Sequence, residues 1–209
     1  SLSTAPDRWM EAAAARRVFV RARALRSEPT MKSSPVTTQA SVLAKRRAAA
    51  ARYKPGTIEL LLIAEAPPCT ADRYFYFEHV DPHDWLFRYV WEGLMGGKPD
   101  REHKAQHLAA LRDAGVYMID LHEESISQPA LSDLLPKVPG LIERCAQLRP
   151  RHIVLIKASV YDAAFTALRA AALPVIDERI PFPSSGQQKR FLESFRRAAA
   201  CAGFVSRVG

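Results

Sequence analysis

Hydrophobic residues along the chain form short continuous runs that alternate with longer amphipathic stretches. The first run, residues 58–68, reads Ile-Glu-Leu-Leu-Leu-Ile-Ala-Glu-Ala-Pro-Pro. It has no period-two alternation, which is typical of a strand buried on both faces of a parallel sheet. Pro67 and Pro68 lack the N–H that a central strand must donate, so the strand must end by about Ala66. Similar runs predict strands over residues 116–121, 152–156 and 174–176.

Between these strands the apolar spacing predicts helices. One begins at Asp81-Pro82 and ends at Gly96-Gly97. Four strands alternating with helices indicate an α/β fold, namely a three-layer α/β/α sandwich with a central, mainly parallel four-stranded sheet, preceded by an N-terminal helical extension. The other predicted helices cover residues 7–26, 42–53, 101–114, 131–148 (one or two helices), 160–171 and 189–201.

Charge divides the chain unevenly. Residues 1–54 contain 12 Lys or Arg and 3 Asp or Glu, whereas the rest contains 18 basic and 19 acidic side chains. We therefore expect a basic helical extension over residues 1–54, with a Ser/Pro-rich linker, and a second domain over residues 55–209. A basic arm on a near-neutral domain favours a polyanionic partner, nucleic acid before membrane. The candidate phosphate contacts are Arg16, Arg17, Lys45, Arg46 and Arg47, although the first helix could equally be a solvated one packed through Trp9 and Phe19.

Cysteine and hydropathy patterns bear on cofactors and location. Cys69, Cys145 and Cys201 are far apart and odd in number, and an iron–sulfur cluster normally needs four cysteine ligands, so no cofactor or metal is expected. His103 and His107 lie four apart but lack a third zinc ligand nearby. No apolar run approaches the roughly 18 residues of a membrane helix, and we expect a cytoplasmic protein without membrane contact. An organelle transit peptide is the less favoured interpretation of the Arg-rich start.

Polar and aromatic residues follow the predicted strands. Glu65 ends the first strand and Asp120 lies near the end of the second, at the sheet edge where open α/β folds bind ligands. Lys157 and Ser159 lie where the third strand turns into a helix, a natural anion site. Four consecutive aromatics, residues 74–77, could stack on a planar ring or fill the core. Glu65 could also be an ordinary solvent-facing loop residue.

The order of these segments resembles the uracil-DNA glycosylase superfamily over roughly residues 56–204. Ala64-Glu65-Ala66-Pro67-Pro68 is similar to the Gly-Glu-Ala-Pro-Gly turn of its thermostable family, and Phe182-Pro183-Ser184 stands in the place of a His-Pro-Ser motif before the last helix. Four departures accompany these matches, and one of them is Asp120, which stands in the place of an Asn. Ala66 occupies the place of a water-activating Asp, Phe182 that of a His that stabilises the leaving uracil anion, and the four cluster-binding cysteines of the thermostable family are missing.

The resemblance implies a role for individual residues. Phe75 or Tyr76 would stack on a flipped uracil, and Asp120 stands where an Asn normally reads the uracil edge. Ala66, Pro67 and Phe182 would complete the base pocket. The expected contacts to DNA are Arg73, Lys157, Ser159, Arg179, Pro183, Ser184, Ser185, Gly186 and Gln187.

These considerations predict a monofunctional, monomeric uracil-DNA glycosylase of base excision repair, which flips the base, hydrolyses its N-glycosidic bond and holds the abasic product tightly. Glu65 or Asp120 would supply the catalytic carboxylate. Asp120 can donate to uracil O4 only when protonated, and burial would raise its pKa toward that state. One alternative is a weakly catalytic or non-catalytic binder of damaged or abasic DNA. Another is an enzyme acting on a nucleotide or phosphate metabolite, which the absence of G-x-G-x-x-G and Walker motifs disfavours.

Overall fold

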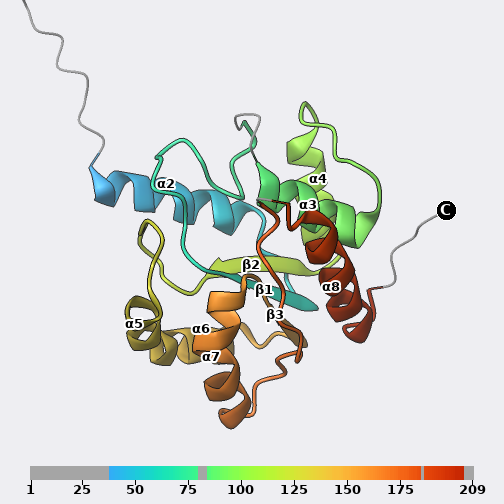
Figure 1. Ribbon diagram of the computed structural model, residues 1–209. Helices are drawn as coiled ribbons and strands as arrows, with labels where there is room; N and C mark the ends of the chain where they lie inside the picture. The colour runs from blue at the N-terminus through green and yellow to red at the C-terminus, as the bar shows by residue number, and fades with distance from the viewer. Residues whose placement is uncertain (1–37, 80–83, 185, 205–209) are drawn as a thin grey trace, which may run out of the picture. The chain divides into compact units, whose positions relative to one another are not determined.

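The computed structural model describes residues 38–79, 84–184 and 186–204. The predicted helix over residues 7–26, the Asp81-Pro82 helix start and Ser185 lie outside these ranges. Within them the fold is mixed α/β with a parallel sheet of β1 (Leu60–Ala64), β2 (Val116–Asp120) and β3 (His152–Leu155). The strand order is β2-β1-β3, with β1 in the centre (Figure 1).

The sheet has three strands, so the prediction of a fourth over residues 174–176 is wrong. Val175 forms only an isolated parallel bridge with Ile153. Pro174 has no N–H to donate, and the N–H of Val175 turns back to the carbonyl of Leu173 at 2.8 Å. The bridge itself is formed by the Ile153 N–H, which donates to the Pro174 carbonyl at 2.9 Å, and the Ile176 N–H, which donates to the Ile153 carbonyl at 2.8 Å. It does not extend into a ladder, because Pro174 lacks the preceding donor and the Ile176 carbonyl already accepts from the Glu178 N–H at 3.0 Å.

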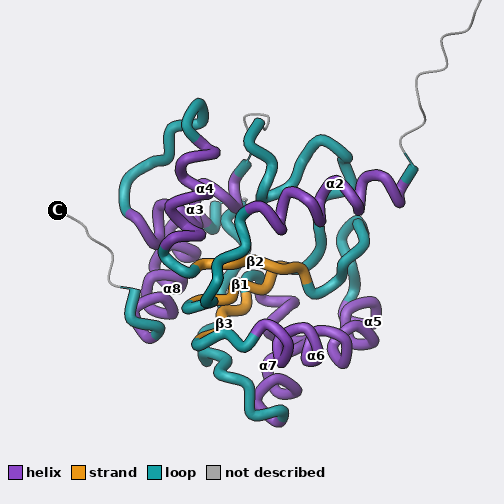
Figure 2. Tube along the Cα trace, turned by 180° about the vertical axis from the view of Figure 1, so that it is seen from behind, coloured by secondary structure: helices purple, strands orange, loops and turns teal. Residues whose placement is uncertain are grey.

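Seven helices and one 3₁₀ turn are described around the sheet. Because β2 and β3 flank β1 on opposite edges, right-handed crossovers place the helices before β2 and those before β3 on opposite faces. Accordingly, α3, α4 and α8 form one group and α5, α6 and α7 another (Figures 1 and 2). The bounds are α2 Gln39–Arg52, α3 Trp85–Met95, α4 Lys104–Asp113, α5 Leu131–Leu134, η1 Leu135–Lys137, α6 Val138–Leu148, α7 Ala158–Ala170 and α8 Gln188–Cys201.

The core lies on both faces of β1, whose five residues are all buried, as the unbroken apolar run predicts. On one side α3 meets α8 closely at Gly93, where an added Cβ would lie 2.4 Å from the ring of Phe195. At the outer edge of the sheet, the backbone N–H of Met118 donates to the hydroxyl of Tyr76 at 2.6 Å, and that hydroxyl lies 3.0 Å from the Met118 carbonyl. Tyr76 thus satisfies backbone groups that an edge strand would otherwise leave unpaired.

Helix α2 packs along the β2 side of the sheet (Figures 1 and 2). Thr38 caps its start by accepting a hydrogen bond from the Ser41 N–H at 3.3 Å. The helix buries Arg46 and Ala50, and the ring of Tyr53 stacks on that of Tyr76 with centroids 6.3 Å apart. The compact unit begins at Thr38, so this helix is part of the same body as the sheet, whereas the charge pattern grouped it with the extension.

Candidate functional site

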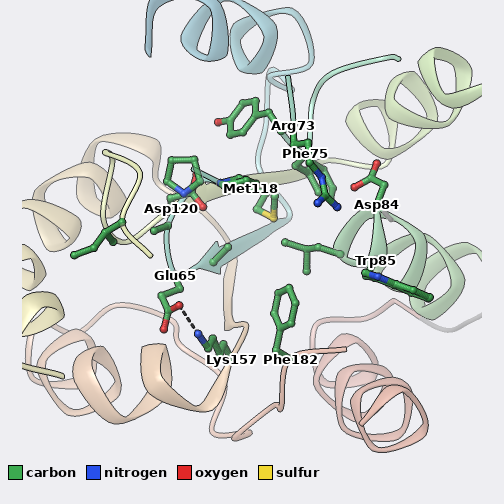
Figure 3. Close-up of a pocket in the computed structure, with 16 residues that line it drawn as sticks. Glu65, Arg73, Phe75, Asp84, Trp85, Met118, Asp120, Lys157 and Phe182 are labelled. Carbon is green, nitrogen blue, oxygen red and sulfur yellow. Dashed lines mark hydrogen bonds and ion pairs between the residues drawn. The ribbon is translucent and has the colours of Figure 1, made fainter. Parts of the chain in front are cut away.

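A cavity of about 320 Å³ lies at the carboxyl ends of β1 and β2 (Figure 3). Glu65 follows β1, Asp120 ends β2, and Lys157 stands between β3 and α7, so the parallel strands bring these three side chains to one edge. Its size suits a ligand as small as a single base, at the low end of the range for ligand pockets. The lining residues are Ala64, Glu65, Ala66, Pro67, Pro68, Arg73, Tyr74, Phe75, Asp84, Trp85, Leu86, Met118, Asp120, Ile126, Lys157 and Phe182.

Eight residues that the sequence singled out share this cavity, although they come from four separate segments of the chain. Figure 3 shows Glu65 and Asp120 on one side, Asp84 and Trp85 on the other, and Phe182 between Lys157 and Trp85. The predicted residues are Glu65, Ala66, Pro67, Arg73, Phe75, Asp120, Lys157 and Phe182.

The Glu65 carboxylate is held by two donors. The ammonium of Lys157 donates to one oxygen and the hydroxyl of Ser159 to the other. The Glu65 side chain is 12% exposed and that of Lys157 36% exposed, so the ion pair lies at the cavity wall with the cation nearer to solvent. Lys157 has φ 86°, a backbone conformation that costs an L-residue on the order of 1–3 kcal/mol. This strained turn presents a positive charge to the cavity.

Asp120 differs from Glu65 because no residue in the described part of the chain donates a hydrogen bond to its carboxylate. Only its backbone carbonyl is engaged, by Nη1 of Arg144 at 2.8 Å. Burial raises the pKa of Asp120 from 3.8 to about 7, the positive charges of Arg46 and Arg144 oppose that rise, and the negative charge of Glu123 adds to it. A carboxyl group with such a pKa can gain or lose a proton near neutral pH.

Sequence reasoning missed a third carboxylate in the cavity, that of Asp84. It precedes α3 but makes no side-chain cap; instead it pairs with the ammonium of Lys104 at 2.6 Å. Lys104 is only 3% exposed at its side chain. Burial raises the pKa of Asp84, which the nearby charge of Lys104 opposes, and burial lowers the pKa of Lys104. The sequence gives no local signal for this pair, because 20 residues separate its members.

Other predicted site residues lie outside the cavity. Tyr76 is a core residue, which leaves Phe75 as the aromatic of that pair able to contact a ligand. Ser159 stands behind Glu65 as its hydrogen-bond donor. Arg179 forms a two-point contact with the Asp162 carboxylate, with N–O distances of 2.8 and 2.7 Å.

The segment before α8 forms a turn beside the cavity. The N–H of Ser184 donates to the Phe182 carbonyl at 2.8 Å, and that of Gln187 donates to the Ser184 carbonyl at 3.0 Å. Gly186 has φ 80°, which favours glycine. Pro183 is buried, and of the described residues of this segment Phe182 alone lines the cavity.

The prediction that Arg46 is a phosphate-contacting residue of a basic arm is wrong, since Arg46 is only 4% exposed. The two basic residues next to it in the sequence are exposed, as a basic surface helix requires. Arg47 pairs with Glu123 at 3.6 Å, and the Lys45 ammonium lies 4.7 Å from the centre of the Phe77 ring. An Arg/Ala-rich helix predicts a solvated basic face, and nothing local distinguishes the one arginine that turns inward.

Two further findings concern metals and membranes. Within residues 38–79, 84–184 and 186–204, no three His, Cys, Asp or Glu side chains are grouped so that they could hold a metal ion. None of the helices in the described part of the chain is long and apolar enough to cross a lipid bilayer.

A scan against known protein families and a search of curated proteins found no match for this chain.

Proposed function

We propose that the protein is a monofunctional glycosylase that excises uracil from DNA, leaving an abasic site. One observation carries the proposal: a single base-sized cavity gathers Glu65, Pro67, Phe75, Asp120 and Phe182, which the sequence spreads over more than a hundred positions. Helices grouped on either side of a parallel sheet, with the cavity at the strands' carboxyl ends, support the same assignment to a uracil-DNA glycosylase-like fold.

The proposed reaction begins with a flipped base entering the cavity. Phe75 and Phe182 line it and offer aromatic surfaces for a planar pyrimidine. Breaking the N-glycosidic bond leaves negative charge on the base and positive character on the sugar. Lys157 is a cation of the cavity wall that could face the leaving base, where a fixed charge in a partly dry site stabilises the transition state.

Asp120 is our candidate for the group that activates the attacking water. Its carboxylate is not tied up by a donor from the described residues, and its pKa of about 7 suits a general base at neutral pH. Glu65 is less suited to accept a proton, because Lys157 and Ser159 already donate to both of its oxygens. Its role in this scheme is to hold Lys157 in place.

DNA contacts would come from around the mouth of this cavity. Arg73 and Lys157 line it, and Ser184 and Gln187, whose N–H groups donate within the turn before α8, adjoin it through Phe182. Backbone N–H groups and cations are the usual phosphate contacts of DNA-binding proteins. The basic excess of residues 1–54 would add contacts that do not depend on sequence.

The test is excision from a labelled duplex that carries one uracil, followed by alkaline cleavage of abasic sites. We expect cleavage by the natural chain and a loss on the order of a hundredfold for Asp120→Ala, typical of removing a general base. Asp113→Ala is the matched control, since Asp113 is an exposed aspartate at the end of α4. Excision of no base by the natural chain would contradict the proposal, and an unaffected Asp120→Ala enzyme would remove Asp120 from it.

A second candidate function is binding of damaged or abasic DNA with little turnover. The engaged state of Glu65 and the apolar Ala66 and Phe182 in the cavity wall favour it, because few free catalytic groups remain. A gel shift of abasic duplex without any cleavage of the uracil duplex would select this function.

A further inference from the structure

Arg46 is an unusual residue for a basic helix, because its guanidinium is buried among carbonyl oxygens. From α2, Nη1 donates to the Ser125 hydroxyl at 2.6 Å. Nη2 lies within 2.5 Å of the Pro68 carbonyl, 2.9 Å of the Thr70 carbonyl and 3.4 Å of the Arg73 carbonyl. One side chain therefore connects three segments: α2, the loop after β1 and the loop after β2.

The loop after β1 needs such a partner. Pro67 and Pro68 remove two backbone donors, so this loop cannot pair its carbonyls through a ladder of its own. The Ser125 hydroxyl also lies 3.0 Å from the Pro68 carbonyl, so Arg46 and Ser125 act on the same oxygen from two elements. Buried carbonyls with a charged donor form strong hydrogen bonds.

Both loops form part of the cavity wall. The loop after β1 contributes Pro67, Pro68 and Arg73, and the loop after β2 contributes Ile126, next to Ser125. Arg46 also lies behind Asp120, because both line a second cavity of about 280 Å³ between α2 and α6. Burying a guanidinium is costly, and Nε of Arg46 has no hydrogen-bond partner among the described residues, so an apolar side chain would fill this place with a smaller loss of stability.

We propose that Arg46 is a positioning residue of the site: it fixes the loop after β1 to the loop after β2 and keeps a positive charge behind Asp120. This inference rests on the proposed function for its effect on activity. The charge behind Asp120 can be tested without it.

Several charged or titratable groups share the surroundings of Asp120, and the test has to separate Arg46 from them. Arg46 lowers the pKa of Asp120, as does Arg144 from α6, so loss of Arg46 should raise it. The other groups are Glu123 in the loop after β2, the phenols of Tyr74, Tyr76 and Tyr117, and the charged residues that line the same cavity, namely Glu65, Lys157, Arg73 and Asp84.

The experiment compares Arg46→Met, Arg46→Lys and Arg169→Met, the last being a matched control because Arg169 is exposed in the last turn of α7 and lines neither cavity. Single-turnover excision of uracil from duplex DNA is measured across pH, and the Asp120 carboxyl is titrated by carbon-13 NMR in the DNA-free protein. For Arg46→Met we expect a loss on the order of a hundredfold, as for misplaced catalytic groups, and a pH–rate limb moved to higher pH. Arg46→Lys keeps the positive charge but not the hydrogen-bond geometry, so its rate should fall while its pH–rate limb stays nearer that of the natural chain. Arg169→Met should change neither the rate nor the limb.

An Arg46→Met protein with the natural rate and an unmoved Asp120 titration would overturn the inference. If Arg46→Met does not fold, Arg46→Lys and Ser125→Ala decide, and natural rates and titrations in both would overturn it as well. If the natural chain excises no uracil, the proposed function fails, but the carbon-13 titration still answers for Arg46. A move to higher pH in Arg46→Met then supports the fixed charge, and no move overturns it.

Discussion

At Asp120 the requirements of stability and of chemistry are opposed. The carboxylate is half-buried, and its pKa lies at about 7 instead of 3.8. Between these values the folded state holds a proton that the unfolded state has released. With respect to this carboxyl group, the free energy of unfolding is therefore highest below about pH 4. It falls as the pH rises, and the loss is complete above about pH 7, where the folded state holds a negative charge away from water. A residue kept for packing alone would not carry this penalty at neutral pH.

Asp120→Asn should separate these two requirements. At pH 8 the variant should be more stable than the natural chain by about 1–3 kcal/mol. Three pKa units correspond to roughly 4 kcal/mol, and residual contact with water reduces the effect. The difference should shrink toward pH 4, where both side chains are neutral. Excision should fall about a hundredfold, because an amide cannot accept the proton. Urea unfolding at pH 4 and pH 8, with single-turnover kinetics, measures both, and equal stability gains at the two pH values would contradict the assignment.

Among the elements, those with continuous apolar runs were predictable from sequence. The structure places β1, β2 and β3 within two residues of the predicted bounds at each end, because runs such as Leu60–Ile63 are buried on both faces. The run at residues 174–176 is also apolar, but it begins with a proline, which none of the three strands contains. There, Pro174 has no N–H to give to the ladder, and the Ile176 carbonyl accepts locally from the Glu178 N–H, a pairing that hydrophobicity does not reveal.

The site was only partly predictable for a related reason. Strand ends locate Glu65 and Asp120, since parallel topology alone brings them together. In the aromatic run, which has no regular periodicity, sequence could not tell that Phe75 faces the cavity while Tyr76 fills the core. The contacts of Arg46 and Asp84 could not be predicted, because their partners lie 20 or more residues away in the chain.

The Asp84–Lys104 pair joins the start of α3 to the start of α4, and its removal gives an element-scale prediction. Asp84→Asn leaves a nearly inaccessible ammonium without its counterion, and breaking such a pair on one side typically costs about 3–5 kcal/mol. Because the Asp84 side chain is 22% exposed, we expect a value near the lower bound. The Asp84→Asn/Lys104→Met double variant should recover most of this loss, as judged by urea unfolding. A double variant no more stable than Asp84→Asn would show that the pair is not the cause.

At the scale of the whole molecule, the positive charge is concentrated in one part of the sequence and the candidate cavity lies in another. The formal net charge of +8 arises within residues 1–54, and the remaining residues are nearly neutral. With Arg46 buried, the exposed basic residues of α2 and the cations of residues 1–37 remain as candidates for contacts to phosphates. The cavity at the strand ends and this basic segment therefore serve separable purposes in our proposal, chemistry in one and affinity in the other.

This separation predicts that charge in the N-terminal segment governs DNA affinity but not the chemical step. Changing Arg16, Arg17, Arg21 and Arg23 together to Gln should weaken duplex binding. It should also reduce the slope of log affinity against log salt by up to about 3–4, at roughly 0.9 per lost phosphate contact. Single-turnover excision at saturating enzyme and low salt should stay within about threefold, because these residues do not form the cavity wall that we describe. The control neutralises four basic residues elsewhere on the chain: Lys98, Arg112, Arg151 and Arg169. Equal salt slopes for the two variants would show that DNA affinity depends on the overall charge of the chain and not on the N-terminal segment. A large fall in the excision rate of the N-terminal variant would mean that the segment takes part in the chemical step.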